Sequence, residues 1–227
     1  MATGPAVVEV PASGLWRVAR GDDPLAVPLS SSSGDAARAN RFDPLTLDYG
    51  VLYFGTSLEV CFAETLARLR PDLSLLALVE QDWADADFMP VGSVPTDWRQ
   101  RRTAVRVQLT KGTRFVDIDS PQTHQFLRKE LALGLSTLGV KELDVSTVRG
   151  DDRRVTQMIS EWVYRNGDGQ GGEVAGIRYE SRLGNGWECW ALFDDVAIEK
   201  VVAERMSITL DLPDLQRIAK LFDLTVF

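Results

Sequence analysis

Residues 52–68 read LYFGTSLEVCFAETLAR, and this segment predicts a short strand, a turn and a helix. The apolar strand ends in Gly-Thr-Ser, which is typical of a turn. Thr56 together with Glu59 fits a capping box that opens the helix. One carboxylate, Glu64, stands among the apolar residues of that helix, and it is the first candidate for a functional group.

The spacing of apolar residues in the helix predicts that Glu64 does not face bulk solvent. Residues at helical spacing form the main core stripe, namely Leu58, Phe62, Leu66 and Leu69. Val60 and Cys61 lie on the other side, beside Glu64, so the first turns are apolar nearly all round. An acid in such surroundings is either neutralised by a partner or kept for chemistry. We expect Glu64 to line an internal pocket or a closed cleft, with a buried Arg–Glu pair as the alternative.

The composition is that of a globular protein with a real core. The chain has 227 residues, of which 44% are hydrophobic and 26% charged, which favours one domain. Residues 1–14 are small and aperiodic, so we expect a loose lead-in followed by a domain over residues 15–227. The net charge of −8 argues against direct nucleic-acid binding. No apolar run reaches membrane-spanning length and no signal-peptide pattern is present, so we expect no membrane contact and a cytoplasmic location.

Cysteine and histidine usage excludes several chemistries. Cys61 and Cys189 both have apolar neighbours, which favours buried inert thiols over a disulfide or a metal site. His124 is the single histidine and lies in an amphipathic helix. We therefore expect no metal and no Ser-His-Asp or Cys-His nucleophile system.

Strands and helices alternate without a regular βαβ repeat, which predicts an α+β domain with a mixed or antiparallel sheet. Strands are expected at residues 15–19, 51–54, 73–80, 113–118, 174–179, 187–193 and 198–203. Helices are expected after residue 57, from residue 121, and at residues 151–164 and 212–222. Residues 24–44 form a long Ser/Gly/Asp-rich loop, a kind of segment that is often functional.

Four residues elsewhere are candidates to act with Glu64. Periodicity alone favours a solvent-facing strand position for Arg17, with a cleft position as the alternative. Arg41 fits a structural salt bridge and a ligand contact equally well. Tyr53 fits core packing with one satisfied hydroxyl, or stacking on a flat heterocycle. Ser181 precedes a hairpin turn, where serine is commonplace.

Taken in order, the segments that hold these residues resemble the RES-domain family, named for an Arg, a Glu and a Ser. They are LWRV, RFDP, LYFGTSLEVCFAETL and GIRYESR, and the match spans residues 15–193. The resemblance implies a fold similar to ADP-ribosyltransferases and, for many members, toxins of bacterial toxin–antitoxin pairs that degrade NAD by phosphorolysis or hydrolysis. It also implies NAD as substrate rather than cofactor, and an antitoxin with a helix-turn-helix region and a tail that blocks the NAD cleft.

The resemblance also implies roles for the candidate residues. Glu64 would stabilise the oxocarbenium-like ribose, Ser181 would orient Glu64 or a ribose hydroxyl, Tyr53 would stack on nicotinamide, and Arg17 and Arg41 would hold phosphate oxygens. The expected catalytic residues are Glu64, Arg41 and Ser181, and the expected NAD-binding residues are Arg17, Arg41 and Tyr53. Thr156 or Ser160 on the preceding helix is the alternative to Ser181.

The chain departs from the family pattern at three places. Many members continue the arginine motif as Arg-Phe-Gly-Gly-Arg-Trp, whereas this chain reads RFDPLT. Residues from about 81 to 112 resemble an insertion, and the tail after residue 193 is an extension. A protein ADP-ribosyltransferase and a non-catalytic interaction module of the same fold remain alternatives to NAD degradation, and the choice between monomer and homodimer stays open.

Overall fold

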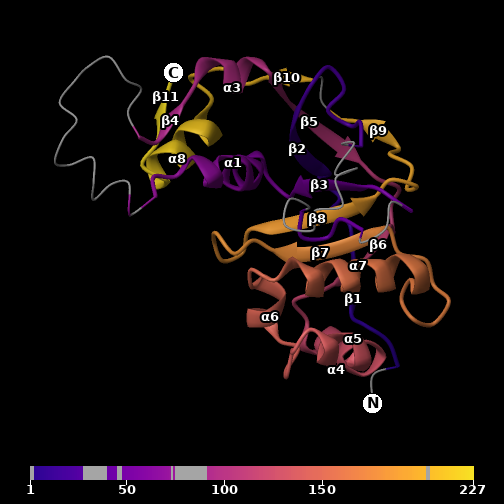
Figure 1. Cartoon of the computed structure of the whole chain (residues 1–227). Helices are drawn as coiled ribbons and strands as arrows, with labels where there is room; N and C mark the ends of the chain where they lie inside the picture. The colour runs from indigo at the N-terminus through magenta and orange to yellow at the C-terminus, as the bar shows by residue number, and fades with distance from the viewer. Residues whose placement is uncertain (1–2, 28–39, 45–47, 73, 75–90, 203–204) are drawn as a thin grey trace.

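The computed structural model describes residues 3–27, 40–44, 48–72, 74, 91–202 and 205–227, and its centre is one twisted sheet (Figure 1). The strands of this sheet are β1 (Val7–Glu9), β2 (Leu15–Arg20), β3 (Val51–Gly55), β5 (Arg102–Gln108), β6 (Arg114–Asp117), β7 (Gly176–Glu180), β8 (Glu188–Phe193), β9 (Lys200–Val201) and β10 (Met206–Ser207). Their order is β1-β6-β7-β8-β3-β2-β5-β10, with β9 also on β5. Within the described residues every pair in this sheet is antiparallel except β6–β7. The predicted α+β class is confirmed.

The helices form two groups at different parts of the sheet (Figure 1). They are α1 (Leu58–Leu66) with the short 3₁₀ helix η1 (Ala67–Leu69), α3 (Thr96–Gln100), α4 (Pro121–Glu130), α5 (Ala132–Thr137), α6 (Val145–Arg149), α7 (Arg153–Asn166) and α8 (Pro213–Leu221). Helices α4 to α7 gather beside β6, β7 and β8, whereas α1 packs against α8 near β2. A small parallel pair, β4 (Ser93–Val94) with β11 (Thr225–Val226), lies beside α8.

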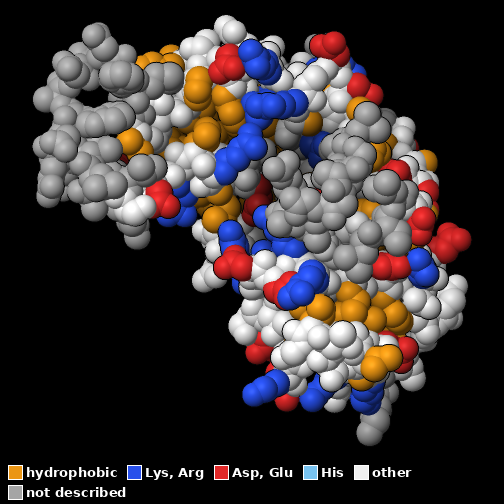
Figure 2. Space-filling view, viewed as in Figure 1, with side chains coloured by type: hydrophobic (Ala, Val, Ile, Leu, Met, Phe, Trp, Pro, Cys, Tyr) orange, Lys and Arg blue, Asp and Glu red, His pale blue; other side chains and the backbone are white. Residues whose placement is uncertain are grey.

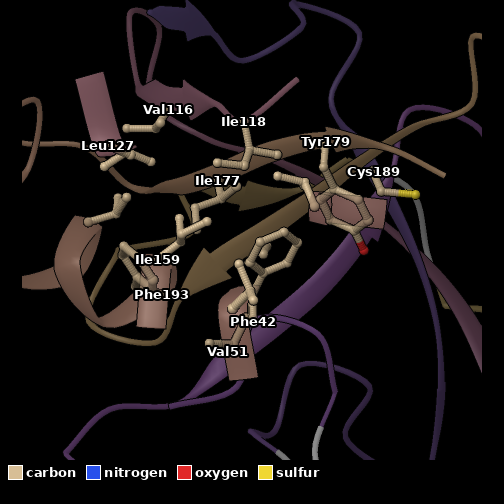
Figure 3. Packing of buried hydrophobic residues seen from close by; sticks show 14 of the residues in the cluster. Phe42, Val51, Val116, Ile118, Leu127, Ile159, Ile177, Tyr179, Cys189 and Phe193 are labelled. Carbon is tan, nitrogen blue, oxygen red and sulfur yellow. The ribbon is translucent and has the colours of Figure 1, made fainter. Parts of the chain in front are cut away.

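Each helix group covers its own hydrophobic core. Phe42, Ile159, Ile177 and Phe193 belong to the core under α4 to α7 (Figure 3). Phe62 is fully buried in a second core that α1 and α8 share. A third core fills the opposite face of the sheet and contains Leu15, Leu52, Phe54, Phe115, Trp190 and Leu192. Strands buried on both faces read as continuous apolar runs, which explains the sequence of β3 and β8.

Several predicted boundaries are confirmed, and two expectations are wrong, the capping box on Thr56 and the loose lead-in at residues 1–14. The strands predicted at 15–19, 51–54 and 187–193 correspond to β2, β3 and β8, and the predicted last helix to α8. The N-cap of α1 is Ser57, which accepts from the Val60 N–H, so the capping box on Thr56 is not formed. Thr56 instead donates to the Glu188 carbonyl at 3.0 Å.

The expected lead-in and the insertion-like region both supply strands of the sheet. Val7–Glu9 in the expected loose lead-in forms β1, because it pairs antiparallel with β6. Within the expected insertion at about 81–112, β5 pairs with β2 along six residues and is an inner strand. The tail after residue 193 supplies β9, β10 and α8. The strand predicted at 73–80 and part of the loop at 24–44 lie outside the described residues.

The sheet divides between β2 and β3. The pairing of these strands is the single pair Trp16–Gly55, whereas β2 pairs with β5 along its whole length. Towards Arg20 the two strands therefore separate. This division lies on the side of the sheet that carries α1, and it provides the space for the site described next.

Candidate active site

A cleft of about 1330 Å³ occupies the division of the sheet, between α1 and the pair α6 and α7. Ten arginines and five carboxylates are among the described residues that line it. Lys and Arg side chains follow the hollow down the middle of the space-filling view (Figure 2). The cleft is therefore positively charged although the whole chain carries −8, which suits an anionic ligand.

Glu64 points into this cleft from the middle of α1. Glu64 thus lines a cleft, as expected, but its side chain is exposed there, and the alternative of a buried Arg–Glu pair is not formed among the described residues. The residues around it on α1 are nevertheless buried, as the apolar pattern predicts. The Glu64 charge raises the pKa of the Cys189 thiol, although burial is the larger cause of that shift. Burial likewise raises the pKa of the Cys61 thiol, to about 12, so both thiols stay protonated at neutral pH.

Ser181 is the hydroxyl that meets Glu64. It directly follows β7, where its N–H donates to the Trp187 carbonyl at 2.8 Å, and its hydroxyl donates to Glu64 Oε1 at 2.5 Å. The Leu183 N–H in turn donates to Ser181 Oγ at 3.0 Å, which fixes the rotamer. Ser181 is only 2% exposed, so this is a well-held hydrogen bond across the chain.

The two alternatives to Ser181 point elsewhere. Ser160 donates to the Phe42 carbonyl at 2.7 Å and accepts from the Tyr49 hydroxyl, inside the core. Thr156 donates to the Arg153 carbonyl within α7. Neither lines the cleft, whereas Ser181 does.

Tyr53 lines the cleft from β3, and its hydroxyl is fully engaged. The hydroxyl donates to Asp43 Oδ1 at 2.8 Å and accepts from the Phe42 N–H at 3.0 Å. Burial and then the neighbouring Asp43 hold the pKa of Tyr53 well above its usual value. Asp43 is 2% exposed and was not among the sequence candidates. Its place directly after Arg41-Phe42 was the available signal, because that motif had already been singled out.

Arg41 is held by the C-terminal end of α6. Its Nη1 donates to the carbonyls of Val148 at 2.6 Å and Gly150 at 3.0 Å, and its Nη2 to that of Arg149 at 3.4 Å. Burial lowers the pKa of Arg41, and the nearby Glu64 charge partly opposes that shift. Arg41 therefore reaches the cleft as a positioned cation whose direct partners are backbone carbonyls rather than Glu64.

Arg17 bridges the division of the sheet. It is 8% exposed, so the solvent-facing position favoured by periodicity is wrong. Its Nε donates to the Pro24 carbonyl at 2.7 Å and its Nη1 to the Tyr53 carbonyl at 3.0 Å, across the point where β2 and β3 part. Its guanidinium also lies 5.9 Å from the Phe54 ring centroid. Burial lowers the pKa of Arg17. The side chain lines the cleft and also closes the sheet.

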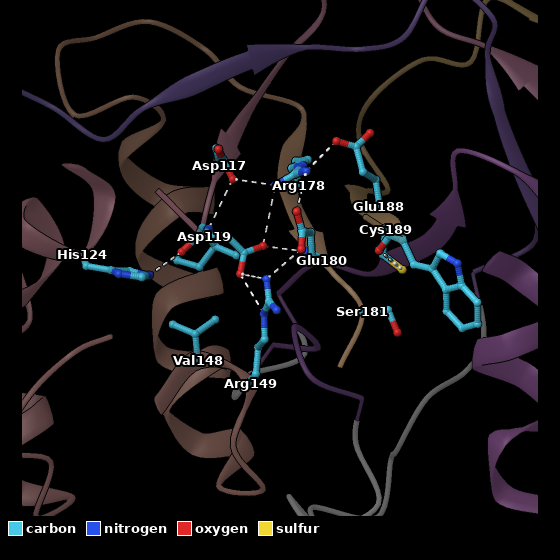
Figure 4. A network of polar contacts seen from close by, with 12 residues as sticks. Asp117, Asp119, His124, Val148, Arg149, Arg178, Glu180, Ser181, Glu188 and Cys189 are labelled. Carbon is cyan, nitrogen blue, oxygen red and sulfur yellow. Dashed lines mark hydrogen bonds and ion pairs between the residues drawn. The ribbon is translucent and has the colours of Figure 1, made fainter. Parts of the chain in front are cut away.

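A network of ion pairs behind the cleft was missed by the sequence analysis (Figure 4). Arg149 donates to Asp119 at 2.9 Å and to Glu180 at 3.1 Å. Asp119 also accepts from the Glu180 N–H at 2.6 Å, directly before Ser181. Arg178 continues the network to other carboxylates on the neighbouring strands, namely Asp117 and Glu188. Asp119 thus ties the segment that holds Arg41 to the strand end that holds Ser181.

The described part of the chain contains no group of three or more His, Cys, Asp or Glu residues placed to bind a metal. His124, the single histidine, is buried with Nε2 2.7 Å from the Ile118 carbonyl. None of the described helices is long and apolar enough to cross a membrane.

The fold and the cleft define a protein with a mixed central sheet and an arginine-rich site around Glu64. Comparison with known proteins gives its family. A family model of the RES domain matches residues 14–213, so the chain belongs to the RES domain family. Comparison with curated protein sequences gives no significant match. Among solved structures, a chain in the crystal structure of the M. tuberculosis MbcT–MbcA toxin–antitoxin complex aligns with a TM-score of 0.49 at 12% identity, over 97% of this chain and 91% of that one.

Proposed function

We propose that this chain is an NAD-consuming enzyme that breaks the nicotinamide–ribose bond. The observation that carries the proposal is the state of Glu64. It is a solvent-accessible carboxylate in an arginine-rich cleft, and its Oε1 is held by Ser181. Within the described residues it forms no ion pair, so its negative charge remains available to a ligand.

The chemistry follows from where charge develops during bond cleavage. The C1′–N bond breaks, its electron pair goes to the ring nitrogen, and neutral nicotinamide leaves an oxocarbenium-like ribose. A fixed carboxylate beside that ribose stabilises the positive charge more in the transition state than in the ground state. A water or phosphate oxygen then bonds to C1′, and a water that attacks releases its proton to the solvent in the open cleft. Glu64 supplies the carboxylate, and Ser181 keeps it in place.

The remaining residues bind the dinucleotide. Arg41 presents a desolvated guanidinium and Arg17 a second one, and such groups bind phosphate oxygens in a fixed geometry. The Tyr53 hydroxyl donates one hydrogen bond and accepts another, which holds the side chain in one orientation. Its ring therefore provides a rigid surface on which nicotinamide can stack. NAD acts as substrate, and no cofactor takes part.

Free nicotinamide released from NAD tests the proposal. Wild-type protein should release it, and Glu64→Gln, which removes the charge but keeps the shape, should lower the rate by at least about a hundredfold. Glu59→Gln on the same helix is the matched control, because Glu59 lies 3.6 Å from Arg217 at the protein surface. No release by wild type, or equal loss in both variants, would exclude the mechanism.

The products separate the possible acceptors. ADP-ribose indicates water, and a phosphorylated ADP-ribose formed only with added phosphate indicates phosphorolysis. Labelled NAD that tags a protein covalently would indicate an ADP-ribosyltransferase instead, and NAD binding without nicotinamide release an interaction module.

The family membership supports a further part of the proposal, that the protein is the toxin of a bacterial toxin–antitoxin pair acting in the cytoplasm. Its antitoxin would carry a helix-turn-helix region. Induced expression in bacteria should then lower cellular NAD and arrest growth, and co-expression of the neighbouring helix-turn-helix gene should restore growth. Arrest by Glu64→Gln at the same expression level would contradict NAD depletion as the cause.

A further inference from the structure

Two arginines lie directly opposite each other at the end of the divided sheet. In the antiparallel pairing of β2 with β5, Arg20 is the partner of Arg102. Side chains of such partners are close on one face of a sheet, and like charges there destabilise the pair. Both arginines line the cleft. A negatively charged ligand bound at this wall of the cleft would offset the repulsion between the two arginines.

Arg68 adds a third positive charge at the same place. It lies in η1, at the C-terminal end of α1, and lines the cleft with the other two. Burial and then the charges of Arg20 and Arg68 lower the pKa of Arg102 to about 10. Arg102 is therefore within electrostatic reach of both Arg20 and Arg68.

Arg102 is the fixed member of this group and the other two are accessible. Arg102 is 6% exposed, donates to the Trp98 carbonyl at 2.9 Å and lies 4.4 Å from the Trp98 ring centroid. Arg20 and Arg68 are exposed. Among the described residues, no carboxylate forms an ion pair with any of the three. Asp97 acts electrostatically on Arg102, but its ion pair, at 3.5 Å, is with Arg101. A small anion in the cleft can thus reach one buried, hydrogen-bonded guanidinium and two exposed ones.

We propose that Arg20, Arg68 and Arg102 form a subsite for a phosphate group carrying two negative charges. The three arginines come from three elements, β2, η1 and β5, and line the same cleft. A terminal phosphate offers three peripheral oxygens to such a triad, and guanidinium groups bind them in a planar fork. The subsite uses other arginines than Arg17, which donates to carbonyls of Pro24 and Tyr53, and Arg41, which donates to carbonyls at the end of α6.

The phosphate could be free inorganic phosphate or a phosphate monoester on the dinucleotide, such as a 2′-phosphate. Only this choice of source rests on the proposed function, and binding itself does not. Titration calorimetry with inorganic phosphate at constant ionic strength therefore uses the full-length Glu64→Gln protein, which keeps the triad without turnover. Parallel titrations compare NAD with its 2′-phosphorylated form, NADP.

Arg20→Gln in that background should weaken binding of the phosphate-bearing ligand by at least about tenfold. Arg128→Gln is the matched control, because Arg128 lies on α4 with its partner Glu142 at 3.4 Å on the exposed surface. If inorganic phosphate shows the loss, it is the source; if NADP loses affinity and NAD does not, the 2′-phosphate is the source. If neither phosphate nor NADP binding depends on Arg20, the proposal is wrong.

Thermal unfolding gives a readout that a merely structural arginine would not produce. In phosphate-free buffer Arg20→Gln should raise the Tm by about 1–3 °C, because it removes like-charge repulsion. The wild type should gain Tm on addition of phosphate beyond an equal ionic strength of chloride, and the variant should not. A Tm that falls in the variant, or an unchanged phosphate response, overturns the proposal. Arg20-dependent phosphate binding without any nicotinamide release would keep the subsite and reject NAD consumption.

Discussion

The two walls of the cleft use arginine in opposite ways. On the paired wall, made by β7, α6 and α7, arginines have carboxylate partners, as Arg149 has Asp119 at 2.9 Å and Arg182 has Asp151 at 2.5 Å. On the unpaired wall, made by β2, β5 and η1, Arg20, Arg68 and Arg102 have no ion-pair partner among the described residues. Paired arginines fix distances between elements, whereas unpaired arginines keep their charge for a ligand. The proposed catalytic pair, Glu64 and Ser181, lies between the two.

The largest expected difference between the walls is in stability. Arg149→Met should lower the free energy of unfolding by about 2–3 kcal/mol, because the partly buried Asp119 and Glu180 would lose one of the two arginines that they share. Arg68→Met on the unpaired wall should change it by less than about 0.5 kcal/mol. Urea unfolding of both variants measures the comparison. Equal effects would mean that the paired wall has no special structural role.

The second prediction concerns the hydroxyl between the walls. Ser181→Ala should lower the rate of nicotinamide release by about ten- to a hundredfold, because a hydrogen bond to a charged group contributes about 1.5–3 kcal/mol. Ser136→Ala, at an exposed position on α5, is the matched control. A variant that keeps full activity would show that Glu64 is held by the helix alone.

The third prediction uses pH to test the burial of two tyrosine hydroxyls beside the cleft, those of Tyr53 and Tyr179. Because the pKa of buried Tyr53 and Tyr179 is raised in the folded state, the unfolded chain loses their protons first as pH rises above about 10. Stability should be unaffected by these groups below pH 10 and fall above it, by up to about 1.4 kcal/mol per pH unit for each tyrosine. Tyr53→Phe should flatten this fall in urea unfolding between pH 9 and 11. An unchanged slope would contradict the burial of its hydroxyl.

The smallest effect is expected at the outer edge of the paired wall. The side chains of Arg182 and Asp151 are 55% and 92% exposed, so solvent screens their ion pair. Arg182→Ala should change the free energy of unfolding by less than about 0.5 kcal/mol. A loss as large as that of Arg149→Met would show that pairing, rather than burial, determines stability on this wall.

Local pattern was enough to predict some of these features. The strand, turn and helix at 52–68 follow from hydrophobic periodicity and turn residues, and the structure places β3 and α1 there. The motif order that resembles the RES domain also led to Ser181, which the structure brings to Glu64 across 117 positions of sequence. Periodicity could not show that Glu64 faces an open cleft, because a helix face is covered or exposed only by what packs on it.

The sequence by itself determined the strand, turn and helix at 52–68 and the short motifs of the family, since each of these depends on neighbours a few residues apart. Only the tertiary structure decided that Arg17 closes a divided sheet, that Asp119 links Arg149 to Glu180, and that Arg20 stands opposite Arg102. Strand register and chain path create those pairs, and a change of register by one residue would move each side chain to the other face of the sheet. The physical reason is that a charge acquires its partner only when distant segments meet.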